Sequence, residues 1–287
     1  MLALHAGDAS LVLAPELGGS ILGWTRGGVA LLRHASPRAL VPGDVHEMAG
    51  FPLVPYSNRI AHGSFRFADT EYRLALNFGD HPHSIHGVGW QRAWLVTSVA
   101  RDAATLTLPH TADASWPFAF IAEQRFRLTA SALYLALAIT NRHTAHAPAG
   151  LGLHPYFPRT TTTVPRAQAT LQFRADTVWR NGADHLPSEP IGVPPEWDHS
   201  TGRTVGDLAL DNCFAGWDGT AVLTWPDRRI TIEADAIFRH LIVYTPPGQD
   251  FFCVEPVSHM NDAINRDGMR VLDPGETLRG EIVFRLA

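Results

Sequence analysis

Two histidines and one glutamate stand where their side chains would be suited to proton transfer. His86 ends the run His-Pro-His-Ser-Ile-His, and His154 lies within Gly-Leu-Gly-Leu-His-Pro-Tyr-Phe. Glu255 follows the apolar run Phe-Phe-Cys-Val. Imidazoles exchange protons near neutral pH, and a carboxylate in apolar surroundings is a suitable partner for them. The sequence therefore predicts an acid–base site assembled from distant segments of the chain.

The residues around each of these side chains indicate what role the side chain could have. His86 precedes Gly87, which lets a ligand or a neighbouring backbone approach closely, but a loop histidine can equally be held by a backbone carbonyl. His154 precedes a proline, which favours extended backbone, and its apolar neighbours predict partial desolvation. Glu255 is expected either to pair with a cation or to act as a base of raised pKa.

Polar residues in two other segments are candidates for binding a substrate. Arg59 lies in an apolar stretch and needs an acceptor, and its guanidinium suits a carboxylate or sugar hydroxyls. The alternative for Arg59 is a structural ion pair. Asp211 begins Asp-Asn-Cys-Phe, where a turn cap is the common explanation. We take Arg59, Asp211 and Asn58 as candidate substrate-binding residues.

A metal site is a further alternative. His81 and His83 form a His-x-His pair similar to half of the metal site of cupins. That site also needs a glutamate shortly after the second histidine, and here Ser-Ile-His-Gly-Val follows. Three ligands could still meet in space, so an enzyme that uses His81, His83 and His86 to hold a metal stays open. Our prediction is that the protein uses no metal and no cofactor.

The composition excludes several chemistries. All 23 basic residues are arginine, so lysine Schiff bases, pyridoxal phosphate enzymes and P-loop NTPases are excluded. The net charge of −5 and the lack of a basic cluster argue against a nucleic-acid partner. Two cysteines make no disulfide framework and predict a cytoplasmic protein with reduced thiols. We find neither a signal peptide nor an apolar run long enough for a membrane span.

Short runs of alternating or continuous apolar residues predict an all-β protein. Convincing helical periodicity is hard to find, and the 24 glycines and 21 prolines punctuate the runs as turns would. We expect large antiparallel sheets in a single β-sandwich domain over residues 1–287. The expected strands are 10–14, 73–76, 94–99, 105–108, 123–128, 133–140, 222–225, 229–234, 241–245, 251–257 and 281–286.

Taken together, the segments resemble the aldose 1-epimerase (galactose mutarotase) family, in its compact bacterial branch. The resemblance covers nearly the whole chain, and the ordered set is more specific than any one piece. The matching segments are Pro15–Gly19, Leu31–Arg33, Pro52–Ile60, His86–Gly87, Trp116–Phe118, Asn141, Gly152–Phe157, Asp211–Phe214, Val254–Pro256 and Leu272–Glu276.

The resemblance implies a β-supersandwich of the galactose mutarotase type and a cofactor-free isomerase that interconverts the α and β anomers of an aldose. Glu255 matches the general base that takes the proton of the C1 hydroxyl. His154 matches the general acid that protonates the ring oxygen, and His86 matches a hydrogen-bonding residue near the anomeric centre. Arg59 and Asp211 match residues that hold sugar hydroxyls.

Two alternatives to a free-aldose epimerase remain. Some relatives act on hexose 6-phosphates, which would require additional arginines at the rim of the site, for example Arg66, Arg73 or Arg92. Others bind carbohydrate without turnover, although this sequence fills both the acid and the base positions. The expected partner is a small monosaccharide, with no nucleic acid and no membrane, and the protein is expected to be a monomer or homodimer.

Overall fold

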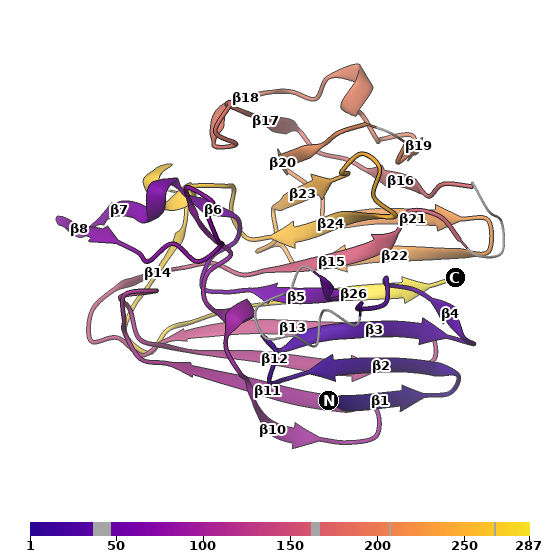
Figure 1. Cartoon of the computed structure of the whole chain (residues 1–287), viewed down its shortest axis with the longest axis horizontal. Helices are drawn as coiled ribbons and strands as arrows, with labels where there is room; N and C mark the ends of the chain where they lie inside the picture. Colours follow the sequence, from indigo (N-terminus) through magenta and orange to yellow (C-terminus); the bar gives the residue numbers. More distant parts are fainter. Residues whose placement is uncertain (37–46, 162–166, 207, 267) are drawn as a thin grey trace.

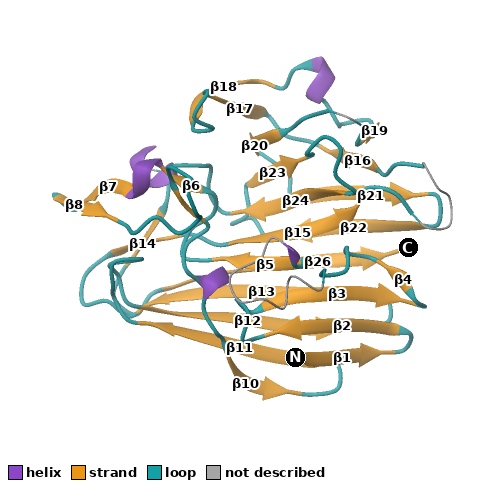
Figure 2. Cartoon of the chain, in the orientation of Figure 1, coloured by secondary structure: helices purple, strands orange, loops and turns teal. Residues whose placement is uncertain are grey.

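The computed structural model describes residues 1–36, 47–161, 167–206, 208–266 and 268–287, and two large antiparallel sheets dominate it (Figures 1 and 2). The first sheet has 11 strands and the second has nine. Within the described ranges, the helical segments are short 3₁₀ turns. The all-β prediction is therefore confirmed. No described helix has the length and hydropathy that crossing a bilayer requires.

The strands of the first sheet run in the spatial order β1, β2, β3, β5, β15, β24, β23, β20, β17, β18, and β4 pairs with β3. Their bounds are β1 (Leu2–Ala6), β2 (Ala9–Ala14), β3 (Ser20–Arg26), β4 (Val29–Ala30), β5 (Gly50–Leu53), β15 (Gly152–Pro158), β17 (Thr177–Asn181), β18 (Pro187–Gly192), β20 (Asp211–Ala215), β23 (His240–Tyr244) and β24 (Phe251–Val257).

The second sheet has the order β10, β11, β12, β13, β26, β22, β21, β16, β19, and three small two-stranded sheets complete the fold. The bounds in the second sheet are β10 (Leu95–Val99), β11 (Ala103–His110), β12 (Phe120–Leu128), β13 (Ala132–Asn141), β16 (Thr170–Phe173), β19 (Arg203–Thr204), β21 (Thr220–Trp225), β22 (Arg228–Ala234) and β26 (Thr277–Leu286). The small sheets pair β6 (Arg59–Ile60) with β9 (Ser84–Ile85), β7 (Ser64–Phe67) with β8 (Thr70–Arg73), and β14 (Ala147–Ala149) with β25 (Arg270–Leu272).

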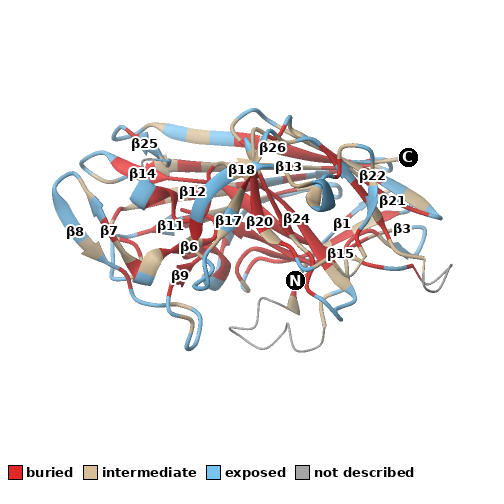
Figure 3. Cartoon of the chain, turned by 90° about the horizontal axis from the view of Figure 1, so that it is seen from above, coloured by how far each residue is buried: buried red, intermediate tan, exposed pale blue. Residues whose placement is uncertain are grey.

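Burial alternates along the strands of the second sheet but is nearly continuous along the middle strands of the first. β12 and β13 bury every second residue, as expected when one face packs on the core. β15 and β24 are buried over almost their whole length (Figure 3). Both faces of the first sheet are therefore covered around β15 and β24.

Two apolar clusters account for this double burial. Leu153 and Phe157 of β15 belong to the larger cluster, which contains residues of both large sheets. Tyr156 and Cys253 belong to a second cluster, together with residues from 48–53 and 85–90. Because side chains alternate along a strand, even-numbered residues of β15 and odd-numbered residues of β24 face this second cluster. His154 and Glu255 are among them.

The backbone around Gly87 ties residues 85–90 to Val54, the residue that follows β5. Val88 and Gly89 both donate backbone N–H groups to the Val54 carbonyl, at 3.0 and 2.9 Å. The Trp90 indole N–H donates to the Gly87 carbonyl at 3.0 Å, and Trp90 is only 1% exposed. These bonds fix the backbone next to His86 against the first sheet.

The described strands confirm most of the expected ones, with one error. Residues 73–76 were expected to form a strand, but β8 ends at Arg73. Beyond it, Leu74 donates its N–H to the Gly63 carbonyl and Ala75 donates to the Ala114 carbonyl. The chain thus leaves its hairpin partner for irregular segments, which an apolar run alone does not reveal.

We predict that Gly87→Ala destabilises the fold far more than Gly79→Ala. Both glycines have positive φ, +72° and +50°, so an alanine costs about 1–2 kcal/mol at either. A Cβ at Gly87 would also lie 2.6 Å from the Val54 carbonyl carbon, whereas Gly79 has nothing within 4 Å. We expect a loss of about 3 kcal/mol or more at Gly87 in urea unfolding. Equal losses in the two variants would contradict this packing argument.

Candidate active site

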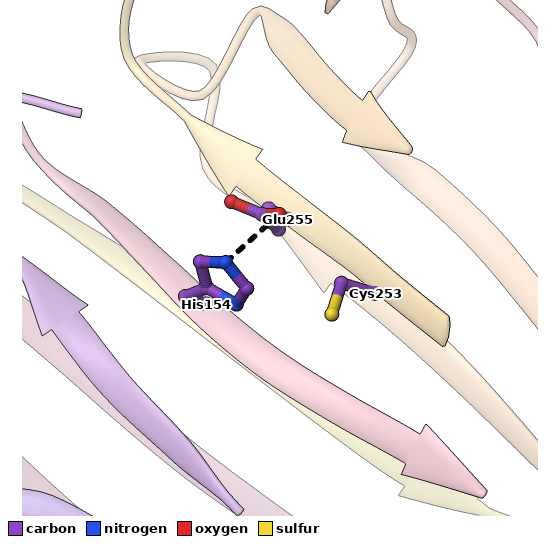
Figure 4. A group of neighbouring side chains, drawn as sticks. All are labelled: His154, Cys253 and Glu255. Carbon is purple, nitrogen blue, oxygen red and sulfur yellow. Dashed lines mark ion pairs between the residues drawn. The ribbon is translucent and has the colours of Figure 1, made fainter. Parts of the chain in front are cut away.

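The register between β15 and β24 places His154 opposite Glu255. Gly152 pairs with Val257 and Tyr156 pairs with Cys253, so the intervening residues face each other. His154 Nε2 lies 3.4 Å from Glu255 Oε1, and the two side chains are only 8% and 2% exposed. Figure 4 shows the imidazole and the carboxyl group pointing toward one another from neighbouring strands. A proton donor and acceptor are thus adjacent in a largely water-free setting.

The electrostatic surroundings of Glu255 favour its protonated form. Burial raises the pKa of this carboxyl well above its usual range, the negative charge of Asp211 raises it further, and Arg59 opposes both. Glu255 Oε2 is buried and has no hydrogen-bond partner among the described residues. Buried polar atoms are nearly always hydrogen-bonded in proteins, so this oxygen is positioned to receive a ligand.

The ring orientation of His86 follows from its backbone partner. The Asn58 N–H donates to His86 Nδ1 at 3.1 Å, and the His86 N–H donates to the Asn58 carbonyl at 2.9 Å. Because Nδ1 accepts, a neutral His86 carries its proton on Nε2 and acts as a hydrogen-bond donor there. His86 has φ of +60°, an uncommon backbone conformation for a residue other than glycine.

A second buried histidine holds the same segment. The Ser57 N–H donates to His259 Nε2 at 3.2 Å, and His259 Nδ1 donates to the Met260 carbonyl at 2.8 Å. Burial lowers the pKa of His259 to about 4, so its acceptor nitrogen is available at neutral pH. Two imidazoles thus fix the backbone on which Asn58 and Arg59 stand. His259 was not among the residues expected from the sequence, because it carries no recognisable spacing signal.

Two aromatic rings pack against the His154 imidazole. Phe51 stacks at a centroid distance of 4.7 Å and Tyr156 stacks at 4.7 Å, with interplanar angles of 28° and 23°. The Arg33 guanidinium lies 3.6 Å from the centroid of the Tyr156 ring. His86 meets the imidazole edge-on at 5.3 Å. Stacking fixes the plane of the His154 ring and leaves its edge for proton exchange.

Arg59 and Asp211 form an ion pair at the site. Arg59 Nη2 lies 3.1 Å from Asp211 Oδ2, and Arg59 Nη1 donates to Asn58 Oδ1 at 3.1 Å. Asp211 begins β20 and pairs across strands with Tyr244. The side chain of Asp211 is 29% exposed, against 12% for Arg59. The ion pair that one interpretation expected is therefore present, and it also presents polar atoms to the cavity described next.

All six residues expected from the sequence to act in catalysis or substrate binding line one cavity of about 180 Å³. Its size suits a ligand smaller than drug-sized molecules, whose sites begin at about 300 Å³. The aromatic and apolar lining was not predicted, although Tyr156 follows His154 by two residues and strand alternation would have placed it on the same face. The lining residues are Asn58, Arg59, Phe78, Ile85, His86, His154, Tyr156, Asp211, Tyr244 and Glu255.

A larger depression of about 500 Å³ lies elsewhere, and its histidine has a structural role. His199 donates from Nδ1 to the Trp197 carbonyl at 2.9 Å and stacks on Phe173. Burial lowers the pKa of His199. The acid–base pair and the ion pair both lie in the smaller cavity, which we therefore take as the candidate active site.

The hydrogen bonds of the histidine-rich run do not favour the three-histidine metal alternative. His83 Nδ1 accepts from the His62 N–H at 3.0 Å, and His83 Nε2 donates to the Asp184 carbonyl at 3.0 Å. His81 Nδ1 accepts from the His83 N–H at 3.2 Å. Both ring nitrogens of His83 are thus engaged with backbone groups, which leaves it no lone pair for a metal.

Comparisons with known proteins agree with this architecture. The family model described as aldose 1-epimerase matches residues 1–285. The uncharacterized protein YphB of Escherichia coli K12 is 31% identical over 290 residues, which cover 94% of this chain and 93% of YphB.

Solved structures share the fold. A protein of E. coli K12 described provisionally as an aldose 1-epimerase superposes with a TM-score of 0.90 at 29% identity, covering 99% of this chain and 98% of its own. A galactose mutarotase-like protein of Clostridium acetobutylicum has a TM-score of 0.85 at 19% identity, over 99% and 94% of the two chains. The predicted β-supersandwich is confirmed, and the chain belongs to the aldose 1-epimerase family.

Proposed function

We propose that the protein is an aldose 1-epimerase that interconverts the α and β anomers of a free aldose. The observation that carries the proposal is the buried pair of His154 and Glu255, 3.4 Å apart at a cavity with further polar groups. Ring opening of a sugar needs a base at the C1 hydroxyl and an acid at the ring oxygen. The pair supplies both from adjacent strands.

In the proposed reaction, Glu255 removes the proton of the C1 hydroxyl while His154 gives a proton to the ring oxygen. The bond between C1 and the ring oxygen breaks, and the open-chain aldehyde forms. Rotation about the C1–C2 bond presents the other face of the aldehyde. On closure the ring oxygen attacks C1 and returns its proton to His154, and Glu255 returns its proton to the new C1 hydroxyl.

The neighbouring polar groups suit binding of a sugar. His86 would donate from Nε2 near the ring oxygen, because its Nδ1 is occupied by the Asn58 N–H. Asp211 would accept hydrogen bonds from sugar hydroxyls, and Arg59 and Asn58 would complete this polar wall. Tyr156 and Tyr244 line the same cavity and offer apolar faces to the C–H groups of a pyranose.

A neutral sugar fits the charges of the cavity better than a hexose 6-phosphate. Arg66 pairs with Asp69 on an exposed hairpin, and Arg92 pairs with Asp113. Neither of them, nor Arg73, lines the cavity, and among the described residues the arginine that does is Arg59. We also propose that residues 1–287 act as one domain, because strands from both halves of the chain are interleaved in each large sheet.

Glu255→Gln and His154→Asn should each lower catalysed anomer exchange by about 10²–10⁴-fold, because each removes one partner of the proton transfer. The measurement is NMR saturation transfer on glucose, galactose, xylose, arabinose, fucose and glucose 6-phosphate. Glu71→Gln on β8, which is exposed, and His110→Asn, which is buried outside the cavity, are matched controls.

Full activity in either site variant would refute the assigned roles. If the wild-type protein binds sugars without accelerating exchange on any of them, the protein is a carbohydrate-binding module instead. Exchange on glucose 6-phosphate alone would establish the phosphorylated substrate class and contradict the charge argument from Arg66, Arg73 and Arg92.

Glu255→Gln should also raise the melting temperature at neutral pH. The unfolded chain loses the carboxyl proton above its ordinary pKa of 4.5, whereas burial keeps the folded pKa well above that value. Between these two values the folded protein binds more protons than the unfolded chain, so wild-type stability falls as pH rises. Glutamine cannot ionise and avoids this loss.

Thermal unfolding across pH measures the effect. The variant should melt above the wild type at about pH 7–8, and the difference should shrink as pH falls toward the unfolded pKa. A difference that stays constant with pH would show that it arises from packing and not from ionisation of Glu255.

A further inference from the structure

We propose that the acid–base pair is also a binding site for a thiophilic divalent cation such as Zn²⁺, with Cys253 as the third ligand, and that this cation inhibits the enzyme. Cys253 precedes Glu255 by two residues on β24, so strand alternation turns both side chains to the same face. Candidate ligand atoms of His154, Cys253 and Glu255 all lie within 4.8 Å of one another (Figure 4).

The donor set suits zinc. Zinc binds thiolate sulfur at about 2.3 Å, imidazole nitrogen at about 2.0–2.1 Å and carboxylate oxygen at about 2.0–2.2 Å in tetrahedral geometry. Ligand atoms around such an ion lie roughly 3.3–3.6 Å apart. His154 Nε2 and Glu255 Oε1, at 3.4 Å, already have this separation. The Cys253 sulfur lies within 4.8 Å of the other two ligand atoms, so it would need to approach them by at most about 1 Å.

A second observation points to a ligand at the same place. Glu255 Oε2 is a buried carboxyl oxygen without a hydrogen-bond partner among the described residues, and the residue is 2% exposed. A polar atom in that state costs free energy until a proton, a hydroxyl or a cation satisfies it. The cavity adjoins this carboxyl and would leave room for water or a sugar hydroxyl in the fourth coordination position.

The protons balance without any co-reactant. Burial raises the pKa of the Cys253 thiol well above its usual range, so the thiol takes no part in proton transfer in the metal-free protein. A bound cation displaces the thiol proton outright. The thiol proton and any proton held between His154 and Glu255 would leave to solvent as the metal–sulfur, metal–nitrogen and metal–oxygen bonds form.

Inhibition follows because the cation occupies the lone pairs that the reaction needs. Metal-bound Glu255 cannot accept the C1 hydroxyl proton, and metal-bound His154 has no proton to give at Nε2. This inhibition rests on the proposed epimerase activity, whereas the binding of the cation does not. Binding and inhibition can therefore be tested separately.

The binding test uses protein stripped of metal with a chelator and then titrated with Co²⁺ or Cd²⁺. We expect a thiolate-to-metal charge-transfer absorption that saturates at one ion per chain. Cys213→Ala should keep this absorption, and Cys253→Ala should lose it. Cys213 is the matched control because it is also a free, buried cysteine, on strand β20 of the same sheet. If Cys253→Ala unfolds, Cys253→Ser replaces it in the test, because serine nearly preserves the side-chain volume.

The inhibition test adds Zn²⁺ to the anomer-exchange assay. Losing a supporting partner of a metal ligand costs about 10–100-fold in affinity, so losing the thiolate itself should raise the inhibitory zinc concentration at least tenfold. Wild type and Cys213→Ala should be inhibited alike, and chelator should restore both.

Absence of the absorption in the wild type, or its persistence in both Cys253 variants, would overturn the binding site. Binding without loss of activity would overturn the inhibitory role. If the wild type exchanges no sugar at all, the proposed function fails, and the absorption alone still decides whether the cation site exists.

Discussion

The interaction on which the site depends is the burial of the Glu255 carboxyl beside the His154 imidazole. Removing a carboxyl group from water favours its protonated form, and Asp211 adds to this effect. The ionised form of such a group is a stronger base than an exposed carboxylate, which suits a residue that must take a proton from a hydroxyl. The arrangement is possible because both faces of the sheet are largely covered around β15 and β24.

The proton-transfer pair and part of the proposed substrate-binding wall stand on different kinds of structure. His154 and Glu255 stand on central paired strands, where a slip of one residue would turn every side chain to the other face. Their geometry is therefore fixed by the same register that builds the core. Arg59 and Asn58 belong instead to residues 57–60, outside the two large sheets, where backbone N–H groups donate to the rings of His86 and His259. A family can vary such a segment while leaving the strands intact.

The sequence revealed the polar residues of the site more readily than their arrangement. His154 and Glu255 were recognisable because a polar side chain inside an apolar run needs a reason to be there. The adjacency of these two residues could not be predicted, because pairing between residues about a hundred positions apart depends on which strands become neighbours. The tautomer of His86 depends on one backbone N–H, and the stacking of Phe51 on His154 depends on a third strand. Strand positions followed from alternation, except at residues 74–76, where irregular partners replaced the hairpin.

The packing of Cys253 and its proposed role as a metal ligand both follow from its position on β24. Cys253 lies between Tyr156 and Tyr244 on the neighbouring strands, so a small apolar group is required there, and a buried cysteine behaves as one. The period of the strand then turns its sulfur to the same face as the base two residues later. Any cysteine that fills this space necessarily offers a soft ligand beside an imidazole and a carboxylate. Cation binding would be avoided there only if another residue replaced Cys253 or if metal ions could not enter the cavity.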